Sequence, residues 1–373
     1  MKPTLLVGLF KPPEELSAAV AMELLYFYAL AHQTSFDVRW IKSRSIQELI
    51  IKPLATKLQA VTLPPTEEGA EPTPALRILG GARVTKLETS ADGRVTSLSY
   101  SSGGWIPGVQ EEQTVDELDG CVLALGAKGM KAVVSGSPAL ARAAPELCAA
   151  GALGGIDVIS CRIWLDKTVA TRTPANVFSR FPQLRGAGGT FFMLDQLQNE
   201  EPQLLWGEDE VQGSVVACDF YNAGGLCPLS DADIVSLLMD ELLPSAVPEF
   251  RRAVVVDSFV ARYPAAVSWF SPGSFSSRPP LQTSVPNLVC AGDWVRLGDR
   301  ETKAKGLCQE RAYIAGLEAA NQLARNGALG GKSKEHVVLE IRDDEPQVVV
   351  GRAVNKLFME ALRPLGLDSP WVR

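Results

Sequence analysis

A short apolar run that ends in a Gly-Asp pair, followed by a long helical pattern, constrains this chain most. Leu288 to Ala291 is short and apolar and follows Pro286, which is typical of a strand buried on both faces of a parallel sheet. Gly292 allows a tight turn, and Asp293 places a carboxylate at the carboxyl end of the strand. The Ala-rich and Leu-rich stretch Glu310 to Ala324 predicts a helix whose partly positive amino end faces that turn. The layout predicts a binding site for a ligand rich in oxygen atoms.

The same residues resemble the carboxyl-terminal flavin-binding segment of the FAD-dependent amine oxidase and phytoene desaturase superfamily. The family pattern is AGD, a spacer, and then S-x-E-G-A-x-x-S-G-x-x-A-A. Three positions depart from it: Cys308 and Ala315 stand where serines are usual, and Arg311 replaces a glycine beside the flavin. The resemblance implies that FAD is the cofactor. The matching residues are Ala291, Gly292, Asp293, Glu310, Ala312, Gly316, Ala319 and Ala320, of which Gly292, Asp293, Glu310 and Ala312 are the expected cofactor contacts.

Two earlier segments extend the resemblance. Alternating apolar residues on both sides of Ala91-Asp92-Gly93 predict a β-hairpin. Val122 to Leu125 predicts another buried strand, which ends at Gly126. In the resembled family the backbone at the position of Val84 meets the adenine ring, and the strand end from Ala124 to Gly126 lies near the dinucleotide. An ordinary hairpin of any α/β protein is the alternative interpretation.

The expected fold is a mixed α/β fold, in which an incomplete FAD/NAD(P)-binding, Rossmann-like domain is interleaved with an antiparallel-sheet substrate domain. We assign residues 1–78 and 136–284 to the substrate domain, 79–135 and 285–326 to the FAD-binding domain, and 335–373 to a C-terminal extension. Helices are expected at Glu14–His32, Ser45–Gln59 and Asp231–Leu243, the last capped by Ser230. Strands are expected at Ile156–Leu165, Gly189–Leu194 and Ser214–Phe220, and the tail should hold two β-like runs, Val337–Ile341 and Val348–Val350, and a helix near Arg352–Leu362.

The glycine fingerprint of a dinucleotide-binding domain is missing from this sequence. Such a domain binds the pyrophosphate with a strand, a G-x-G-x-x-G turn and a helix. No G-x-G-x-x-G occurs in these 373 residues. The chain therefore resembles a family member that begins after its fingerprint or has lost it.

Composition excludes several classes of function. The hydrophobic content of 46% supports a sizeable core, and the net charge of -7 without a basic stripe argues against binding of nucleic acid. Seven scattered cysteines without a CxxC pair indicate an intracellular location, and the resemblance leaves a plastid open. His32 and His336 lack partners at metal-binding spacing, so we expect no metal site. The apolar run Leu16 to Ala31 is too short to span a membrane; it is either a core helix or, as in carotenoid desaturases, a surface that rests on one.

These expectations lead to two hypotheses about function. The first is an FAD-dependent oxidoreductase that dehydrogenates a hydrophobic substrate, such as a carotenoid, by hydride transfer to the flavin. No catalytic side chain is predicted, because the cofactor would carry the chemistry. The second is a truncated or catalytically silent relative that acts as a binding or scaffold module. Candidate aromatic residues for an apolar pocket are Trp164, Phe191, Phe192, Trp269 and Phe270.

Overall fold

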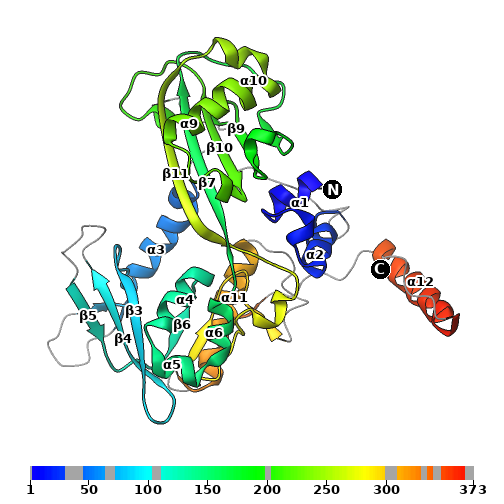
Figure 1. Ribbon diagram of the computed structural model, residues 1–373. Coiled ribbons are helices and arrows are strands. Elements are labelled where there is room, and N and C mark those ends of the chain that lie inside the picture. Colours follow the sequence, from blue (N-terminus) through cyan, green and yellow to red (C-terminus); the bar gives the residue numbers. More distant parts are fainter. Residues whose placement is uncertain are drawn as a thin grey trace.

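The computed structural model describes residues 2–29, 45–63, 72–102, 111–197, 203–298, 309–328, 334–338 and 346–365. Figure 1 shows two lobes, which the long strands β7 (Gly155–Leu165) and β11 (Val255–Ser268) connect. One lobe holds a five-stranded antiparallel sheet, and the other holds a parallel pair, a three-stranded antiparallel sheet and several helices. This mixed α/β architecture with an antiparallel sheet confirms the predicted fold class.

The five-stranded sheet has the order β11-β7-β10-β9-β8. Along β7, Ile159, Cys161 and Ile163 alternate into a core against helices, as a period of two requires. The helices are α9 (Asp231–Ser236) and α10 (Leu243–Ala246), which Figure 1 shows over one face of the sheet. Ser230 caps α9 through a reciprocal capping box, as predicted. The remaining strands are β8 (Ala175–Phe178), β9 (Gly188–Met193) and β10 (Val215–Tyr221), and two short helices, α7 (Leu194–Leu197) and α8 (Gln203–Trp206), follow β9.

The opposite face of this sheet carries the alternate residues of the same strands, and we call it the open face. The strand register aligns Phe259 with Arg162, and Tyr263 with Val158. Phe259 is 63% exposed and Tyr263 is 48% exposed, so this face is accessible along β11. Further across the sheet, Phe10 stacks on Tyr221, a Cβ on Gly188 would meet Leu6, and Thr190 is 5% exposed. The accessible part of the open face therefore lies along its edge strands.

The second lobe is built around a parallel pair of strands, β6 (Cys121–Leu123) and β12 (Leu288–Cys290). Leu123, Leu288 and Cys290 enter one core, and Val289 packs on the other side against Ala319. The helices of this lobe are α4 (Ala127–Ser135), α5 (Pro138–Ala143), α6 (Pro145–Gly151) and α11 (Gln309–Arg325). Helices α5 and α6, which the predicted division placed in the substrate domain, contribute to the first of these cores.

The predicted hairpin is present as β3 (Arg83–Thr89) and β4 (Val95–Ser102), and β5 (Glu111–Val115) extends it. Asn287 is fully buried and joins this sheet to the parallel pair. Its side chain accepts from Val95 N at 2.9 Å and donates to Val95 O at 2.8 Å and to Asp119 O at 3.3 Å. One amide thus satisfies buried backbone groups of two segments and fixes the sheets relative to each other.

The amino-terminal segment lies between the two lobes (Figure 1). It consists of α1 (Lys2–Gly8) and α2 (Ala18–Ala29). Trp269 Nε1 donates to Glu15 O at 2.9 Å, and Phe10 stacks on Tyr221 at a ring distance of 4.4 Å. These contacts attach the segment to the end of β10 and to the residue that follows β11. Nearby in sequence are α3 (Lys52–Gln59) and the short pair β1 (Thr62–Leu63) and β2 (Thr73–Pro74).

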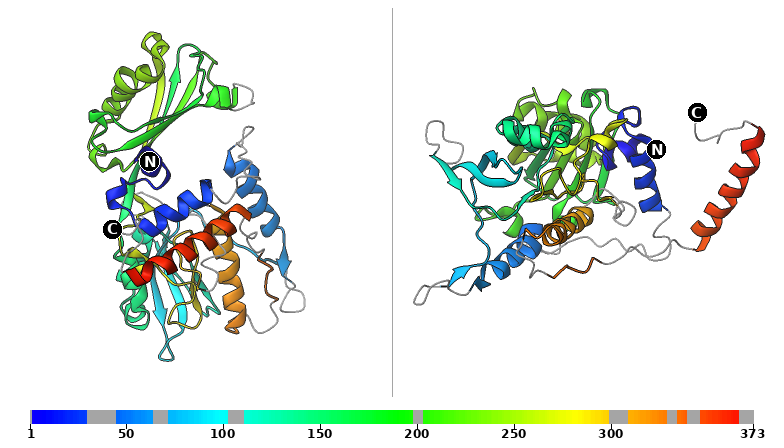
Figure 2. Two further views of the ribbon diagram at one scale, coloured as in Figure 1. Left: turned by 90° about the vertical axis from the view of Figure 1, so that its right-hand side faces the viewer. Right: turned by 90° about the horizontal axis from the view of Figure 1, so that it is seen from below.

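The predicted strand Val348–Val350 is wrong, because these residues belong to α12 (Pro346–Leu362). Pro346 stands at the first position of the helix, where proline is favoured, and the helical pattern continues from there. Figure 2 shows α12 apart from both lobes. Among the described residues, no helix is long and apolar enough to cross a membrane. That part of the chain also holds no group of histidine, cysteine and acidic side chains that could bind a metal.

Candidate functional site

The ends of β6 and β12 lie side by side. The strands run parallel with Leu123 beside Cys290, and Ala291 N donates to Leu123 O at 3.1 Å. Because parallel strands end at the same edge of a sheet, the residues after Leu123 and those after Ala291 emerge together. The structure thus brings Ala124 to Gly126 next to Gly292 and Asp293, which are 166 or more positions apart in the sequence.

Gly292 adopts a backbone conformation that only glycine tolerates well. Its φ angle is 137°. The chain then turns so that Trp294, which is 2% exposed, packs beneath the strand ends. Trp294 Nε1 donates to Leu125 O at 2.9 Å. The turn after β12 is therefore tied directly to the turn after β6.

Asp293 is half-buried at this edge. Burial raises the pKa of its carboxyl, while backbone N–H groups of Asp293 and Trp294 and the positive charges of Arg311 and Arg278 oppose that rise. Arg278 is itself 3% exposed and stacks on Phe275 at 4.6 Å. A carboxylate in such a setting accepts hydrogen bonds strongly, which suits a ligand hydroxyl group.

Arg311 is the largest fully buried side chain near this turn, and it is 1% exposed. Its Nε donates to Asp293 O at 2.8 Å, and its Nη2 donates to Val295 O at 3.0 Å. The guanidinium therefore holds the first turn of α11 against the turn after β12. The sequence showed Arg311 as a departure from the family pattern; the structure shows what it binds.

Gly126 is the residue at which β6 ends and α4 begins. A Cβ atom there would meet nothing within 4 Å, so the space beside it is open. Gly126 caps α4 without a side-chain hydrogen bond, which leaves the first N–H groups of the helix available to an anion. Two residues later, Lys128 Nζ donates to Pro264 O at 3.4 Å. The start of α4, directly after the end of β6, thus lies next to β11.

Three further residues were predicted to contact the cofactor, and they lie at different distances from the strand ends. Val84 is 37% exposed on β3, close to Gly136 at the far end of α4, because a Cβ on Gly136 would collide with Thr85 O. Nine helical residues separate the two ends of α4, which is roughly 14 Å at ~1.5 Å per residue. Glu310 is exposed and Ala312 half-buried in the first turn of α11, whereas Cys308 lies outside the described residues.

The residues present fit one part of an FAD molecule. The open space beside Gly126, the positive φ of Gly292 and the acceptor on Asp293 suit a ligand that carries hydroxyl groups and approaches backbone closely. The amino ends of α4 and α11 face the same edge and suit oxygen atoms. Among the described residues β6 pairs with β12 alone, and Val122 is 43% exposed. The pyrophosphate loop expected of a dinucleotide site is not in this sequence.

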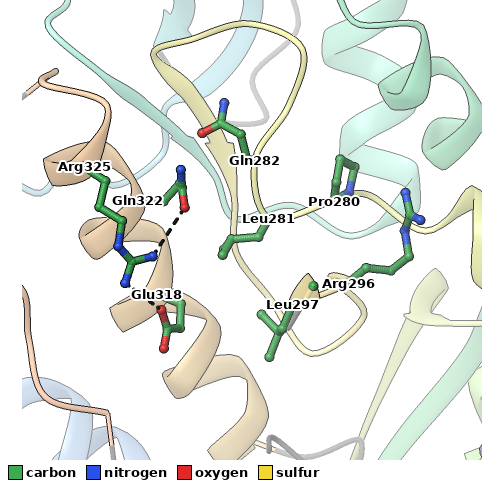
Figure 3. Close-up of a pocket in the computed structure, with 9 residues that line it drawn as sticks. Pro280, Leu281, Gln282, Arg296, Leu297, Glu318, Gln322 and Arg325 are labelled. Atoms are coloured by element: carbon green, nitrogen blue, oxygen red, sulfur yellow. Dashed lines mark hydrogen bonds and ion pairs between the residues drawn. The ribbon is translucent and has the colours of Figure 1, made fainter. Parts of the chain in front are cut away.

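A separate cavity of about 560 Å³ opens along α11 (Figure 3). Glu318, Gln322 and Arg325 project into it from the same face of α11 as Arg311, about two to four turns further on. Arg325 Nη1 donates to Gln322 Oε1 at 3.5 Å and Arg325 Nη2 lies 3.8 Å from Glu318 Oε2. Asp293 does not line this cavity, so it is distinct from the site at the strand ends.

Trp294, Lys128 and Arg278 were not among the predicted site residues. The signal for Trp294 was available, because it directly follows the Gly-Asp pair in the sequence. Lys128 and Arg278 gave no signal, since their importance comes from the tertiary contacts described above.

The sequence matches a known protein family. The model of a family described as flavin containing amine oxidoreductase matches residues 13–324. A carotenoid phi-ring synthase of Chlorobaculum tepidum is 26% identical over 258 residues, which is 67% of this chain and 36% of that protein.

Solved structures give weaker likenesses. Cyclohexylamine oxidase from Brevibacterium oxydans IH-35A has a TM-score of 0.38 at 11% identity, over 67% of this chain and 48% of that one. An oxidoreductase from Methanosarcina mazei has a TM-score of 0.37 at 14% identity, over 64% and 49%. The chain thus spans about a third of the length of the synthase and about half of each solved relative. Because the family model covers most of its residues, the protein belongs to the flavin-containing amine oxidoreductases, a family whose cofactor is FAD.

Proposed function

We propose that this protein is an FAD-dependent oxidoreductase that removes hydrogen from a hydrophobic substrate of the carotenoid class. The observation that carries the proposal is the contact of Lys128 with Pro264 O at 3.4 Å. Lys128 lies in the first turn of α4, so the strand end at Gly126 is close to β11, which is one edge strand of the sheet that carries the open face. A cofactor held at the strand ends and a substrate held on the open face would then be neighbours.

The open face suits an apolar substrate. Phe259 and Tyr263 offer exposed aromatic rings, and Val177 on β8 is 53% exposed. Phe192 and Trp164 lie on the same face by strand register, and both are half-buried. Aromatic and branched side chains on a flat sheet bind an extended apolar molecule through burial of surface.

The other three aromatic residues predicted to line an apolar pocket pack within the protein instead. Phe191 is fully buried in the core between the sheet and the helices, and Phe270 is 5% exposed in the other core. Trp269 binds Glu15 O, and Lys11 lies over its ring at 4.4 Å. These three therefore do not contribute to the open face.

FAD, when bound, supplies the chemistry by accepting a hydride from a carbon atom of the substrate. Asp293 would hold a ribityl hydroxyl group by accepting its hydrogen bond, and Gly126 and Gly292 would let the cofactor approach the backbone. The first N–H groups of α4 would face its oxygen atoms. The apolar side chains of the open face would exclude water and orient the substrate carbon.

The carotenoid phi-ring synthase supports this substrate class. It is similar to two thirds of this chain, which corresponds to about a third of its own length. The activity of the whole relative is therefore a proposal here.

We also propose that the helical segment 46–58 rests on a membrane surface, where an apolar substrate would dissolve. Its apolar side chains are exposed, and Lys52 and Lys57 stand among them to meet anionic headgroups. Replacement of Leu54, which is 47% exposed, by glutamate should reduce co-sedimentation with anionic vesicles. Unchanged co-sedimentation of Leu54→Glu would exclude this surface. The exposed residues are Ile46, Leu49, Ile50, Ile51, Leu54 and Leu58.

A catalytically silent relative is the competing function. Arg311 favours it, because it stands where the family pattern has a glycine beside the flavin.

An activity assay distinguishes the oxidoreductase from the catalytically silent relative. The full chain is incubated with FAD, a detergent-dispersed carotenoid and an electron acceptor, and products are separated by chromatography and mass spectrometry. The oxidoreductase predicts an FAD-dependent product that lacks two hydrogen atoms, and Asp293→Ala should reduce its amount. Carotenoid binding without any such product, with FAD present, would support the silent relative instead.

A further inference from the structure

The middle of the open face is polar, although its surroundings are apolar. Ser160, Asp219 and Thr190 stand directly opposite one another on β7, β10 and β9. Ser160 Oγ donates to Asp219 Oδ1 at 2.6 Å, and the hydroxyl groups of Thr190 and Tyr221 lie 3.1 Å apart. These four residues come from three neighbouring strands, and we call them the polar row.

Apolar side chains lie on the same face as the polar row. Phe259 and Tyr263 lie on β11, Phe192 on β9 and Val177 on β8, opposite Thr190. Arg162 and Asp257 also lie on this face and are exposed. An extended apolar molecule that covers the centre of this surface would meet the hydrogen-bonding groups of the row. Burying those groups without a partner would cost about 1–3 kcal/mol, so the row selects against a pure hydrocarbon.

The position of Asp219 is unfavourable for a charged carboxylate. It is half-buried in the centre of a sheet, and burial raises the pKa of its carboxyl, although Ser160 and the charge of Arg162 oppose that rise. In the described part of the chain, the one hydrogen bond recorded for its side chain is the bond from Ser160. A partly buried carboxylate in the middle of a sheet is more typical of a binding site than of a stabilising core.

The polar row is also close to the strand ends. Tyr263 on the open face is the residue before Pro264, whose carbonyl binds Lys128. Strand β11 has a bulge here, at which Ala265 has a φ of 52° and Ala265 N donates to Asp157 Oδ1 at 2.8 Å. Tyr263 pairs with Val158 of β7, and Asp219 pairs with Ser160 of the same strand. The two positions are therefore two residues apart along β7, which is roughly 7 Å.

We propose that Asp219, with Ser160 beside it, binds the single polar group of an otherwise apolar substrate, namely a hydroxyl group. The inference rests on the proposed function, because it deepens the identity of the substrate that the open face would hold. The carboxylate accepts from the hydroxyl group, and that bond fixes where along the sheet the apolar chain lies. The position of the polar group then decides which carbon atom reaches the strand ends. Asp219 is thus a positioning residue.

Two probes with one carbon skeleton test the proposal: β-carotene and its singly hydroxylated form, β-cryptoxanthin. Their dissociation constants for the full chain are measured without FAD, from quenching of tryptophan fluorescence in the same detergent. The parent protein should bind the hydroxylated probe roughly five to ten times more tightly, as expected for one hydrogen bond to a charged group. Asp219→Ala should abolish this preference while it leaves the affinity for β-carotene similar or higher.

Two further variants keep the test sharp. Ser160→Ala removes the neighbouring hydroxyl group and should weaken the preference, and it reports on the row even if Asp219→Ala fails to fold. Asp240→Ala removes an exposed carboxylate from the helical layer behind the sheet and should keep the parent's preference. Equal affinity of the parent for both probes, or an unchanged preference in both Asp219→Ala and Ser160→Ala, would overturn the polar row. Failure of the parent to bind either probe would overturn the substrate surface itself, and with it this part of the proposed function.

Discussion

Trp294 Nε1 donates to Leu125 O at 2.9 Å, and this bond joins the turns that follow two parallel strands. The indole lies in the core, so the bond is shielded from water and its loss would leave a buried carbonyl unpaired. The geometry of the whole edge depends on the path of the backbone between Ala291 and Trp294, which a single glycine makes possible.

Gly292→Ala should therefore destabilise the protein. With φ at 137°, an alanine is strained by roughly 1–3 kcal/mol, and its Cβ would also contact the Trp294 ring at 3.4 Å. Gly316→Ala is the matched control, because Gly316 lies in α11 and a Cβ there meets nothing within 4 Å. That change should stabilise the helix by roughly 0.5–1 kcal/mol. Urea unfolding measures both, and free-energy changes of the same sign would contradict the assignment.

The sequence predicted the elements that local patterns determine. The runs that form β6 and β12, the hairpin of β3 and β4, and the helix cap at Ser230 each carry their signal in neighbouring residues. The long strand β11 carries no clear signal, because Pro264 interrupts its pattern. In the structure Pro264 lies at the bulge, where the ladder needs no N–H group from it.

The contacts within the candidate site could not be predicted from the sequence, because they join residues that are far apart along the chain. From the sequence, Arg311 is a cation at a position where the family has a glycine beside the cofactor. In the structure its guanidinium donates hydrogen bonds to the carbonyls of Asp293 and Val295, and these bonds follow from the packing of α11 against the turn. Ser160 and Asp219 are 59 positions apart, and only the register of β7 and β10 makes them a pair.

Arg311→Ala should cost stability through the same turn. The variant loses two charge-assisted hydrogen bonds to buried carbonyls and should lower the free energy of unfolding by roughly 2–4 kcal/mol. Arg311→Lys should recover only part of this, because one ammonium group cannot reproduce the fork of a guanidinium. Lys86→Ala, in which an exposed ion pair with Glu88 is lost, should change stability by less than about 1 kcal/mol. Equal losses in Arg311→Ala and Lys86→Ala would argue against a structural role for the buried guanidinium.

The pH dependence of stability should report the setting of Asp219. Its pKa is raised in the folded protein above the ordinary value of 3.8, so the folded state holds this proton more tightly than the unfolded state. The stabilising contribution is complete below that ordinary value and is lost as pH rises through the raised pKa. The stability of Asp219→Asn relative to the parent should therefore increase from about pH 4 upward.

Asp233 gives the opposite expectation and serves as the control. Hydrogen bonds from Ser230 lower the pKa of its carboxyl, so its contribution is present above the ordinary value and is lost as pH falls. Asp233→Asn should thus lose stability relative to the parent as pH rises. Both comparisons use the midpoint of urea unfolding at several pH values. A flat difference for Asp219→Asn would mean that its carboxyl is ordinary.

The central claim is that the Gly-Asp turn holds the flavin cofactor, and FAD binding by two aspartate variants tests it most directly. FAD is titrated into the folded parent, Asp293→Ala and Asp116→Ala, and flavin fluorescence is followed. Asp116 is exposed in the same lobe, so both variants lose one negative charge and a general electrostatic effect would appear in each. The account predicts a loss of roughly ten- to a hundredfold in affinity for Asp293→Ala, equal to ~1.5–3 kcal/mol, and little change for Asp116→Ala. Equal affinities of the parent and Asp293→Ala would contradict the claim and leave the turn a purely structural feature.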